Sequence, residues 1–184
     1  MPNLTLTPIP GLIEIHPAVY EDARGYFFES YNRRTFSGIG ISCEFVQDNQ
    51  SHSSKGVLRG LHFQRARPQA KLVRVLSGRV FDVAVDLRPG SATYKKWYGV
   101  TLCSELRNML YIPEGFAHGF LALSEGVQVA YKCSDFYDPA DEGGIPWDDP
   151  SVGIIWPDIG MEPVLSEKDR AYEKLEVRDR NGRP

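Results

Sequence analysis

Polar side chains suited to ligand chemistry are concentrated between residues 45 and 64, in the run FVQDNQSHSSKGVLRGLHFQ. Apolar residues are interleaved with them, so the run predicts strands rather than an open loop. A buried polar group needs a hydrogen-bond partner, and this density of such groups is typical of a ligand pocket. A half-buried strand pair with a solvated polar face is the alternative, and periodicity does not separate the two. The polar members of the run include Gln47, Asp48, Asn49, Arg59, His62 and Gln64.

Two histidines are candidate acid–base groups. His62 lies between Leu61 and Phe63, so its side chain should point away from theirs, and His118 lies where a turn runs into a strand. Imidazole titrates near neutral pH and is the commonest general base in enzymes. At both positions a hydrogen-bonded structural histidine is the alternative.

Cationic and phenolic side chains offer complementary chemistry. Arg24, Arg59 and Lys71 are suited to receive a diphosphate, because cationic groups bind phosphate oxygens. Ordinary surface ion pairs use the same residue types. Tyr131, in a predicted strand over residues 127–134, is either a packed aromatic or a phenol that donates a proton.

Asp169 has two competing interpretations. It is the third residue after Ser166 in the run SEKD, a pattern typical of a helix cap. A carboxylate at this position could instead orient the imidazole of a histidine, as in acid–base dyads. The residue pattern alone favours the cap.

The spacing around His62 argues against a metal. Cupin-type jelly rolls often bind a metal through a His-x-His pair, which places two imidazoles on one face of a strand. Here the second position is Gln64, and an amide is a poor replacement for imidazole, carboxylate or thiolate ligands. We therefore predict a site without a metal.

The elements that must position these groups are short strands separated by Gly- and Pro-containing turns. Strict alternation over residues 81–87 predicts one strand and residues 71–76 another, with Ser77-Gly78 between them as a hairpin turn. Further strands are predicted near residues 13–15, 25–30, 97–102, 108–112, 119–123 and 127–134. Short helices are predicted over residues 32–37 and 170–175. The expected fold is all-β, a jelly-roll barrel with a few short helices.

Composition limits the function classes. With 184 residues the chain predicts one domain, and its 21 basic and 24 acidic residues form no like-charge run that would indicate nucleic-acid binding. No apolar stretch approaches the ~18–20 residues of a membrane span. The first residues lack the features of a signal peptide. Three cysteines without CxxC spacing predict reduced thiols and a cytoplasmic protein.

Several longer motifs occur in a characteristic order. They are DARGYFFES from residue 22, the run 45–64, KLVRV from 71, VFDVAVDLR from 80, IPEGFAHGF from 112, YK at 131, GIPWDDP from 144 and LSEKD from 165. On these motifs the chain closely resembles the dTDP-4-dehydrorhamnose 3,5-epimerase family. The resemblance extends over about residues 9 to 170.

The resemblance implies a cupin-like jelly roll over residues 1–184, with an N-terminal arm and a C-terminal segment packed on the barrel. It also implies a homodimer without a metal or organic cofactor, whose partner is a dTDP-sugar rather than a nucleic acid or membrane. The implied reaction inverts C3 and C5 of dTDP-4-dehydro-6-deoxy-D-glucose to give dTDP-4-dehydro-L-rhamnose, a step in dTDP-L-rhamnose synthesis.

The resemblance further implies roles for single residues. His62 corresponds to the general base, Asp169 to its dyad partner, Tyr131 to the general acid and Lys71 to the group that stabilises charge on the C4 oxygen. The positions that resemble substrate-binding residues are Arg24, Phe28, Glu29, Gln47, Asp48, Asn49, Arg59, Lys71, His118, Tyr137, Glu142 and Lys168.

Two other functions stay open at this point. An epimerase of another dTDP-4-keto sugar, acting at C3 or C5 alone, would use the same base and acid. A non-catalytic sugar-nucleotide-binding cupin is the alternative from a different class, and the joint presence of His62, Tyr131, Lys71 and Asp169 argues against it.

Overall fold

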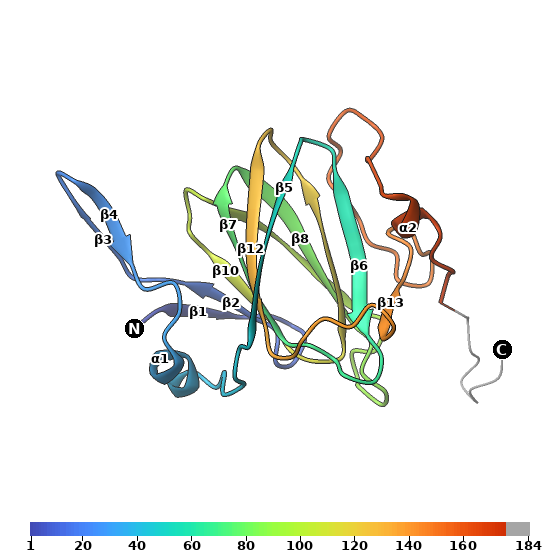
Figure 1. Cartoon of the computed structure of the whole chain (residues 1–184), viewed down its shortest axis with the longest axis horizontal. Helices are drawn as coiled ribbons and strands as arrows, with labels where there is room; N and C mark the ends of the chain where they lie inside the picture. The colour runs from blue at the N-terminus through green and yellow to red at the C-terminus, as the bar shows by residue number, and fades with distance from the viewer. Residues whose placement is uncertain (176–184) are drawn as a thin grey trace.

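Two antiparallel sheets face each other in the computed structural model, which describes residues 1–175 (Figure 1). One sheet contains, in spatial order, β1 (Asn3–Leu6), β2 (Ile13–His16), β10 (Met109–Ile112), β7 (Lys71–Ser77), β12 (Val127–Cys133) and β5 (Gln47–Ser53). The other contains β13 (Glu142–Gly144), β6 (Leu58–Gln64), β11 (Phe116–Ala122), β8 (Arg79–Asp86) and β9 (Trp97–Cys103). The predicted all-β, cupin-like jelly roll is confirmed.

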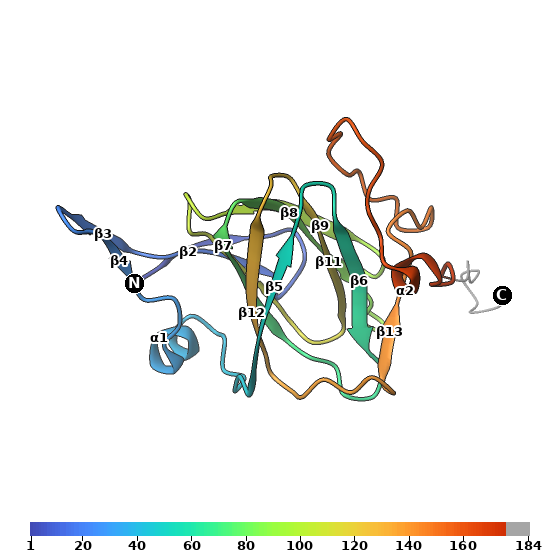
Figure 2. The same ribbon diagram turned by 45° about the horizontal axis from the view of Figure 1, so that its top comes forward.

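A separate two-stranded hairpin is formed by β3 (Val19–Asp22) and β4 (Gly25–Phe28). It projects from the barrel on the side of α1 (Arg33–Gly38), as Figures 1 and 2 show from two directions. The helix α1 is capped by the side chain of Asn32, which accepts from two backbone N–H groups. This cap agrees with the helix predicted at residue 32.

Two local predictions are wrong. Ser77-Gly78 does not close a hairpin, because β7 and β8 belong to different sheets and the chain crosses from one sheet to the other there. The φ angle of Gly78 is +76°, and a Cβ would lie 2.5 Å from the Ser124 hydroxyl, so glycine is needed for the crossing. The helix α2 (Glu167–Arg170) starts earlier than predicted and ends at the first residue of the predicted range 170–175, since the Ala171 N–H already bonds to the Lys168 carbonyl. Strands β1, β3 and β13 were not predicted.

Both faces of β8 are buried, each against a different hydrophobic cluster. Val83 and Val85 face an outer cluster with Leu61 and Ile145, against which Trp156 of the C-terminal segment packs. Ala84 faces the inner cluster between the two sheets. Burial of each large apolar side chain contributes roughly 1.5–3 kcal/mol. The C-terminal segment is thereby held against the second sheet, with α2 beside β6 and β13 (Figures 1 and 2).

None of the helices within residues 1–175 combines the length and apolar character that crossing a membrane would require.

Candidate active site

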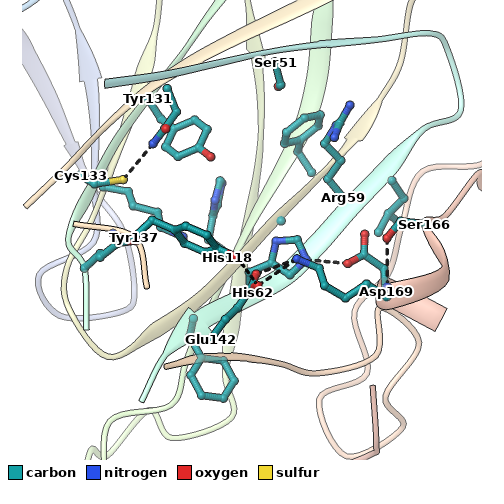
Figure 3. Close-up of a pocket in the computed structure, with 18 of the residues that line it drawn as sticks. Ser51, Arg59, His62, His118, Tyr131, Cys133, Tyr137, Glu142, Ser166 and Asp169 are labelled. Atoms are coloured by element: carbon teal, nitrogen blue, oxygen red, sulfur yellow. Dashed lines mark hydrogen bonds and ion pairs between the residues drawn. The ribbon is translucent and has the colours of Figure 1, made fainter. Parts of the chain in front are cut away.

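A cavity of about 740 Å³ opens between the two sheets (Figure 3). Its volume falls within the roughly 300–1,000 Å³ that small-molecule sites span. The walls come from β5, β7 and β12 of one sheet and from β6, β11 and β13 of the other, with the α2 segment at one side. The run 45–64 therefore lines a ligand pocket, and the solvated-face alternative is wrong for Gln47, Asn49, Arg59 and His62.

His62 and Asp169 form a dyad at one wall. Nε2 of His62 lies 2.6 Å from Oδ1 of Asp169, whose side chain is only 4% exposed. Burial acts to raise the pKa of Asp169, but the hydrogen bond and charge of His62, with help from Ser166, hold it below its ordinary value. The carboxylate is therefore ionised and able to stabilise a protonated imidazole.

The helix cap at this point does not compete with the dyad. The Ser166 hydroxyl caps α2 by accepting from the backbone N–H of Asp169 at 3.1 Å, while the Asp169 carboxylate turns to His62. The preference for a capping carboxylate is thus wrong. The cap binds the backbone N–H of Asp169, which holds the backbone in place while the side-chain carboxylate contacts His62.

Glycines allow the two histidine-bearing strands to approach closely. Gly60 has φ +118°, and a Cβ there would lie 2.5 Å from the Cα of Gly119. No other residue fits such a contact. The register of β6 against β11 pairs His62 with His118, and it shifts between His118 and Phe120. Both histidines consequently line the same cavity.

His118 is held by a second buried carboxylate. Its Nε2 lies 3.0 Å from each carboxylate oxygen of Asp82, which is completely buried. Asp82 stands on β8, and the register of β8 against β11 pairs Asp82 with Phe120 and Ala84 with His118. Sequence reasoning missed Asp82. The available signal was an acidic residue within an otherwise apolar strand, VFDVAV, where a buried carboxylate would need a partner.

Lys71 and Tyr131 come from the opposite sheet. Burial lowers the pKa of Lys71, and Cys133, Asp82 and Glu142 oppose that shift without cancelling it. Burial also raises the pKa of Tyr131, reinforced by Cys133, so the phenol keeps its proton. Figure 3 shows the Tyr131 hydroxyl directed into the cavity from the side opposite Asp169. A cationic donor and a neutral acid therefore lie across the cavity from the dyad.

Strand β5 presents alternate residues to the cavity. Gln47 donates to the Asn49 side chain at 3.0 Å and accepts from the backbone N–H of Tyr137 at 2.8 Å. Ser51 continues the same face, and its buried hydroxyl has no partner among residues 1–175. Sequence reasoning missed Ser51, although alternation from Gln47 and Asn49 pointed to it. Asp48 lies on the other face and pairs with Lys132 at 2.9 Å, so it does not line this cavity.

Arg59 closes the cavity near Ser51. Its Nε donates to the Ser53 hydroxyl and its Nη2 to the His52 carbonyl, both at 3.0 Å. These bonds fix the guanidinium while leaving N–H groups for a ligand.

A polar group lies at the rim beside β13. The Tyr137 hydroxyl donates to Glu142 at 2.8 Å, and Nζ of Lys168 lies 2.9 and 3.0 Å from the two Glu142 oxygens. Glu142, Tyr137 and Lys168 all line the cavity, as predicted for ligand-binding positions.

Arg24, Phe28 and Glu29 do not reach the cavity of their own chain. Arg24 pairs with Asp22 at 2.6 Å on the projecting hairpin, where its side chain is 90% exposed. Phe28 packs at the base of the hairpin, and Glu29 accepts from Asn32. Their predicted role in substrate binding stays a prediction.

Gln64 has a structural role. Its amide N–H groups donate to the carbonyls of Arg67 and Phe136, and its oxygen accepts from the Asp138 N–H. These bonds tie the end of β6 to the segment after β12. Within the described residues no cluster of three His, Cys, Asp or Glu side chains is arranged to hold a metal ion. The metal-independent reaction stays a prediction.

Fold and site together define a cupin-like jelly roll whose cavity carries a histidine–aspartate dyad opposite a lysine and a phenol. The chain belongs to the dTDP-4-dehydrorhamnose 3,5-epimerase family, whose model matches residues 6–177. A dTDP-4-dehydrorhamnose 3,5-epimerase from Methanothermobacter thermautotrophicus is 55% identical over 170 residues, covering 92% of both chains. One from Salmonella typhimurium is 52% identical over 172 residues, covering 92% of this chain and 93% of its own.

Solved structures of 3,5-epimerases have the same fold as this chain. The dTDP-6-deoxy-D-glucose-3,5-epimerase from Legionella pneumophila Philadelphia 1, in complex with dTDP-4-keto-L-rhamnose, superposes with a TM-score of 0.93. The two sequences are 47% identical, and the match covers 100% of this chain and 98% of that one.

Proposed function

We propose that this protein inverts C3 and C5 of dTDP-4-dehydro-6-deoxy-D-glucose to give dTDP-4-dehydro-L-rhamnose. The observation that carries the proposal is the placement of the His62–Asp169 dyad on one wall, with Lys71 and Tyr131 on the facing sheet. Family membership supplies the nucleotide sugar. The reaction belongs to dTDP-L-rhamnose synthesis.

The base in this scheme is His62. C3 and C5 flank the C4 ketone, so their protons are acidified and leave as protons rather than hydrides. Nε2 of His62 is engaged by Asp169, and therefore Nδ1 takes the proton. The carboxylate stabilises the imidazolium that results.

The enolate formed by proton removal carries negative charge on the C4 oxygen. A positioned cationic donor is most effective where such charge develops. Lys71 is assigned this role, because it lines the cavity from β7 on the sheet that faces His62.

Inversion requires a proton from the opposite face of the ring. Tyr131 is assigned as the acid, since its phenol points into the cavity from the sheet that faces His62. The pKa of Tyr131, raised chiefly by burial, keeps this proton available at neutral pH.

The remaining cavity residues bind the nucleotide and the sugar. Arg59 is suited to a phosphate oxygen, and the amides of Gln47 and Asn49 to polar atoms of the ligand. Glu142 and Lys168 form an ion pair at the edge of the cavity, and Tyr137, which donates to Glu142, is available to stack on a planar base.

We further propose a cytoplasmic homodimer of single-domain subunits in which the β3–β4 hairpin reaches the partner's cavity. A lone two-stranded hairpin is marginally stable in water. Here it exposes Phe27 at 70% and Tyr20 at 67%, an apolar surface suited to a second copy. This arrangement would bring Arg24, Phe28 and Glu29 to a substrate. The three cysteines, all free, are compatible with the cytoplasm.

Proton NMR in deuterium oxide tests the proposed reaction. With dTDP-4-dehydro-6-deoxy-D-glucose as substrate, we expect solvent deuterium at both C3 and C5 and the L-rhamno product. Exchange at one position alone would identify a single-position epimerase. Binding without exchange would identify a non-catalytic sugar-nucleotide-binding protein.

A further inference from the structure

Asp82 is a buried carboxylate with no role in the scheme above. It is completely buried on β8, and the two Nε2–oxygen contacts with His118, each 3.0 Å, are its hydrogen bonds within the described chain. Transfer of an unpaired carboxylate into such a place would cost several kcal/mol. The Asp82–His118 pair is therefore a built unit rather than an incidental contact.

The geometry determines which nitrogen of His118 meets a ligand. Since a carboxylate only accepts, the Nε2 proton points at Asp82. Nδ1 is engaged by no hydrogen bond within residues 1–175, and His118 lines the cavity beside His62. A neutral His118 would offer a ligand only an acceptor at Nδ1, whereas an imidazolium would offer a charged N–H donor.

The charges around the pair favour the donor. Asp82 supplies a full negative charge in direct contact, and it also interacts electrostatically with Lys71 on the facing sheet. Burial lowers the pKa of Lys71, which makes the positive charge of its ammonium group less favourable in this cavity. A protonated His118 in contact with the Asp82 carboxylate would supply a second positive charge there.

We propose that Asp82 is a positioning residue that holds His118 as an imidazolium, whose Nδ1–H donates to the C4 oxygen of the substrate alongside Lys71. The inference rests on the proposed function, because it assigns a donor to the enolate of that reaction. No covalent bond forms or breaks at His118, and its proton stays on the ring throughout. The His62–Asp169 dyad moves protons, while the His118–Asp82 pair stabilises charge.

The test compares two buried carboxylates on one strand. Asp82→Asn keeps the side-chain volume and removes the charge, so kcat should fall about 10²–10³-fold, the range for loss of one oxyanion donor. The KM should change by less than about threefold, because the donor acts mainly in the transition state. Asp86→Asn is the matched control. Asp86 is equally buried on the same face of β8, but it binds Arg88, Ser91 and Thr93 away from the cavity. This control should lower the Tm and leave the kcat of the folded enzyme within about twofold of wild type.

A double-mutant cycle shows whether Asp82 acts through His118. Asp82→Asn added to His118→Asn should slow the enzyme little beyond His118→Asn alone, whereas independent sites would multiply their effects. Long-range ¹H–¹⁵N NMR of wild-type protein needs no variant and should show both ring nitrogens of His118 protonated at neutral pH. A kcat within about threefold of wild type for Asp82→Asn, multiplicative losses, or a neutral His118 would each overturn the inference. If the wild-type enzyme itself exchanges no substrate proton, the proposed function fails instead.

Discussion

Replacing Asp169 with asparagine tests the dyad directly. The substitution keeps the size of the side chain but removes the charge that faces Nε2 of His62 at 2.6 Å. An amide also offers a donor or an acceptor, so it can stabilise the wrong tautomer of the imidazole. We expect a large loss of kcat with an intact fold.

The size of the loss follows from the exposure of the pair. The His62 side chain is 27% exposed and that of Asp169 is 4% exposed, so the pair lies near a protein surface rather than deep inside. At an effective dielectric constant of about 20 and a charge separation of roughly 4 Å, the carboxylate attracts the imidazolium by about 4 kcal/mol. Each ~1.36 kcal/mol changes a rate tenfold, so complete loss corresponds to about 10³-fold. Water entering the site offsets part of this, and we expect about 10²–10³-fold, within the range for general acid–base catalysis.

The assay is the rate of solvent deuterium incorporation into dTDP-4-dehydro-6-deoxy-D-glucose, followed by proton NMR at saturating substrate. Ser166→Ala is the control, because it removes the hydroxyl that caps α2 while leaving the Asp169 carboxylate in place. Loss of a helix N-cap costs about 0.5–2 kcal/mol of stability, so this variant should unfold earlier and retain most of its kcat.

A kcat for Asp169→Asn within about threefold of wild type would refute the dyad as a catalytic unit. So would an equal loss in Ser166→Ala, because the effect would then come from the position of α2 rather than from the charge.

Four further outcomes are expected. Tyr131→Phe should lower net epimer formation far more than deuterium exchange, because His62 can return a proton to the original face; equal losses would remove Tyr131 as the dedicated acid. Burial lowers the pKa of Lys71 and raises that of Tyr131, so the alkaline limb of kcat should lie below about 10.4, the ordinary lysine value, and Lys71→Arg should move it upward. An unmoved limb would assign it to another group. Burial acts to raise the pKa of Asp86, but the hydrogen bonds from Arg88 and its neighbours outweigh it and hold the pKa well below its ordinary value. The ionised pair therefore stabilises the fold above the unfolded-state pKa of about 3.9 and loses that contribution as pH falls toward the folded-state value. Asp86→Asn should cost about 3–5 kcal/mol at pH 7 and progressively less in acid, measured by denaturant unfolding; a pH-independent cost would contradict this. Dialysis against a strong chelator should leave the rate unchanged, and a loss restored by one divalent metal would overturn the metal-independent scheme.

Local chemistry was predictable from the residues alone. Alternation identified β8, because successive side chains on a strand point to opposite sides. Asn32 identified the start of α1, since its side chain accepts from the first free N–H groups. Long ordered motifs identified the family. All of these depend on residues within a few positions of one another.

Apart from the His62–Asp169 pair, which the family resemblance implied, the contacts between distant segments were decided by the tertiary structure. His62 and Asp169 are 107 residues apart, and His118 and Asp82 are 36 apart, so no local pattern connects them. The crossing at Gly78 between two sheets shows the same limit, because a turn residue does not specify which sheet the next strand joins. Those pairings follow from packing two sheets and a C-terminal segment around a shared core. Buried carboxylates need hydrogen-bond partners, and the packing brings His62 to Asp169, His118 to Asp82 and Arg88 to Asp86.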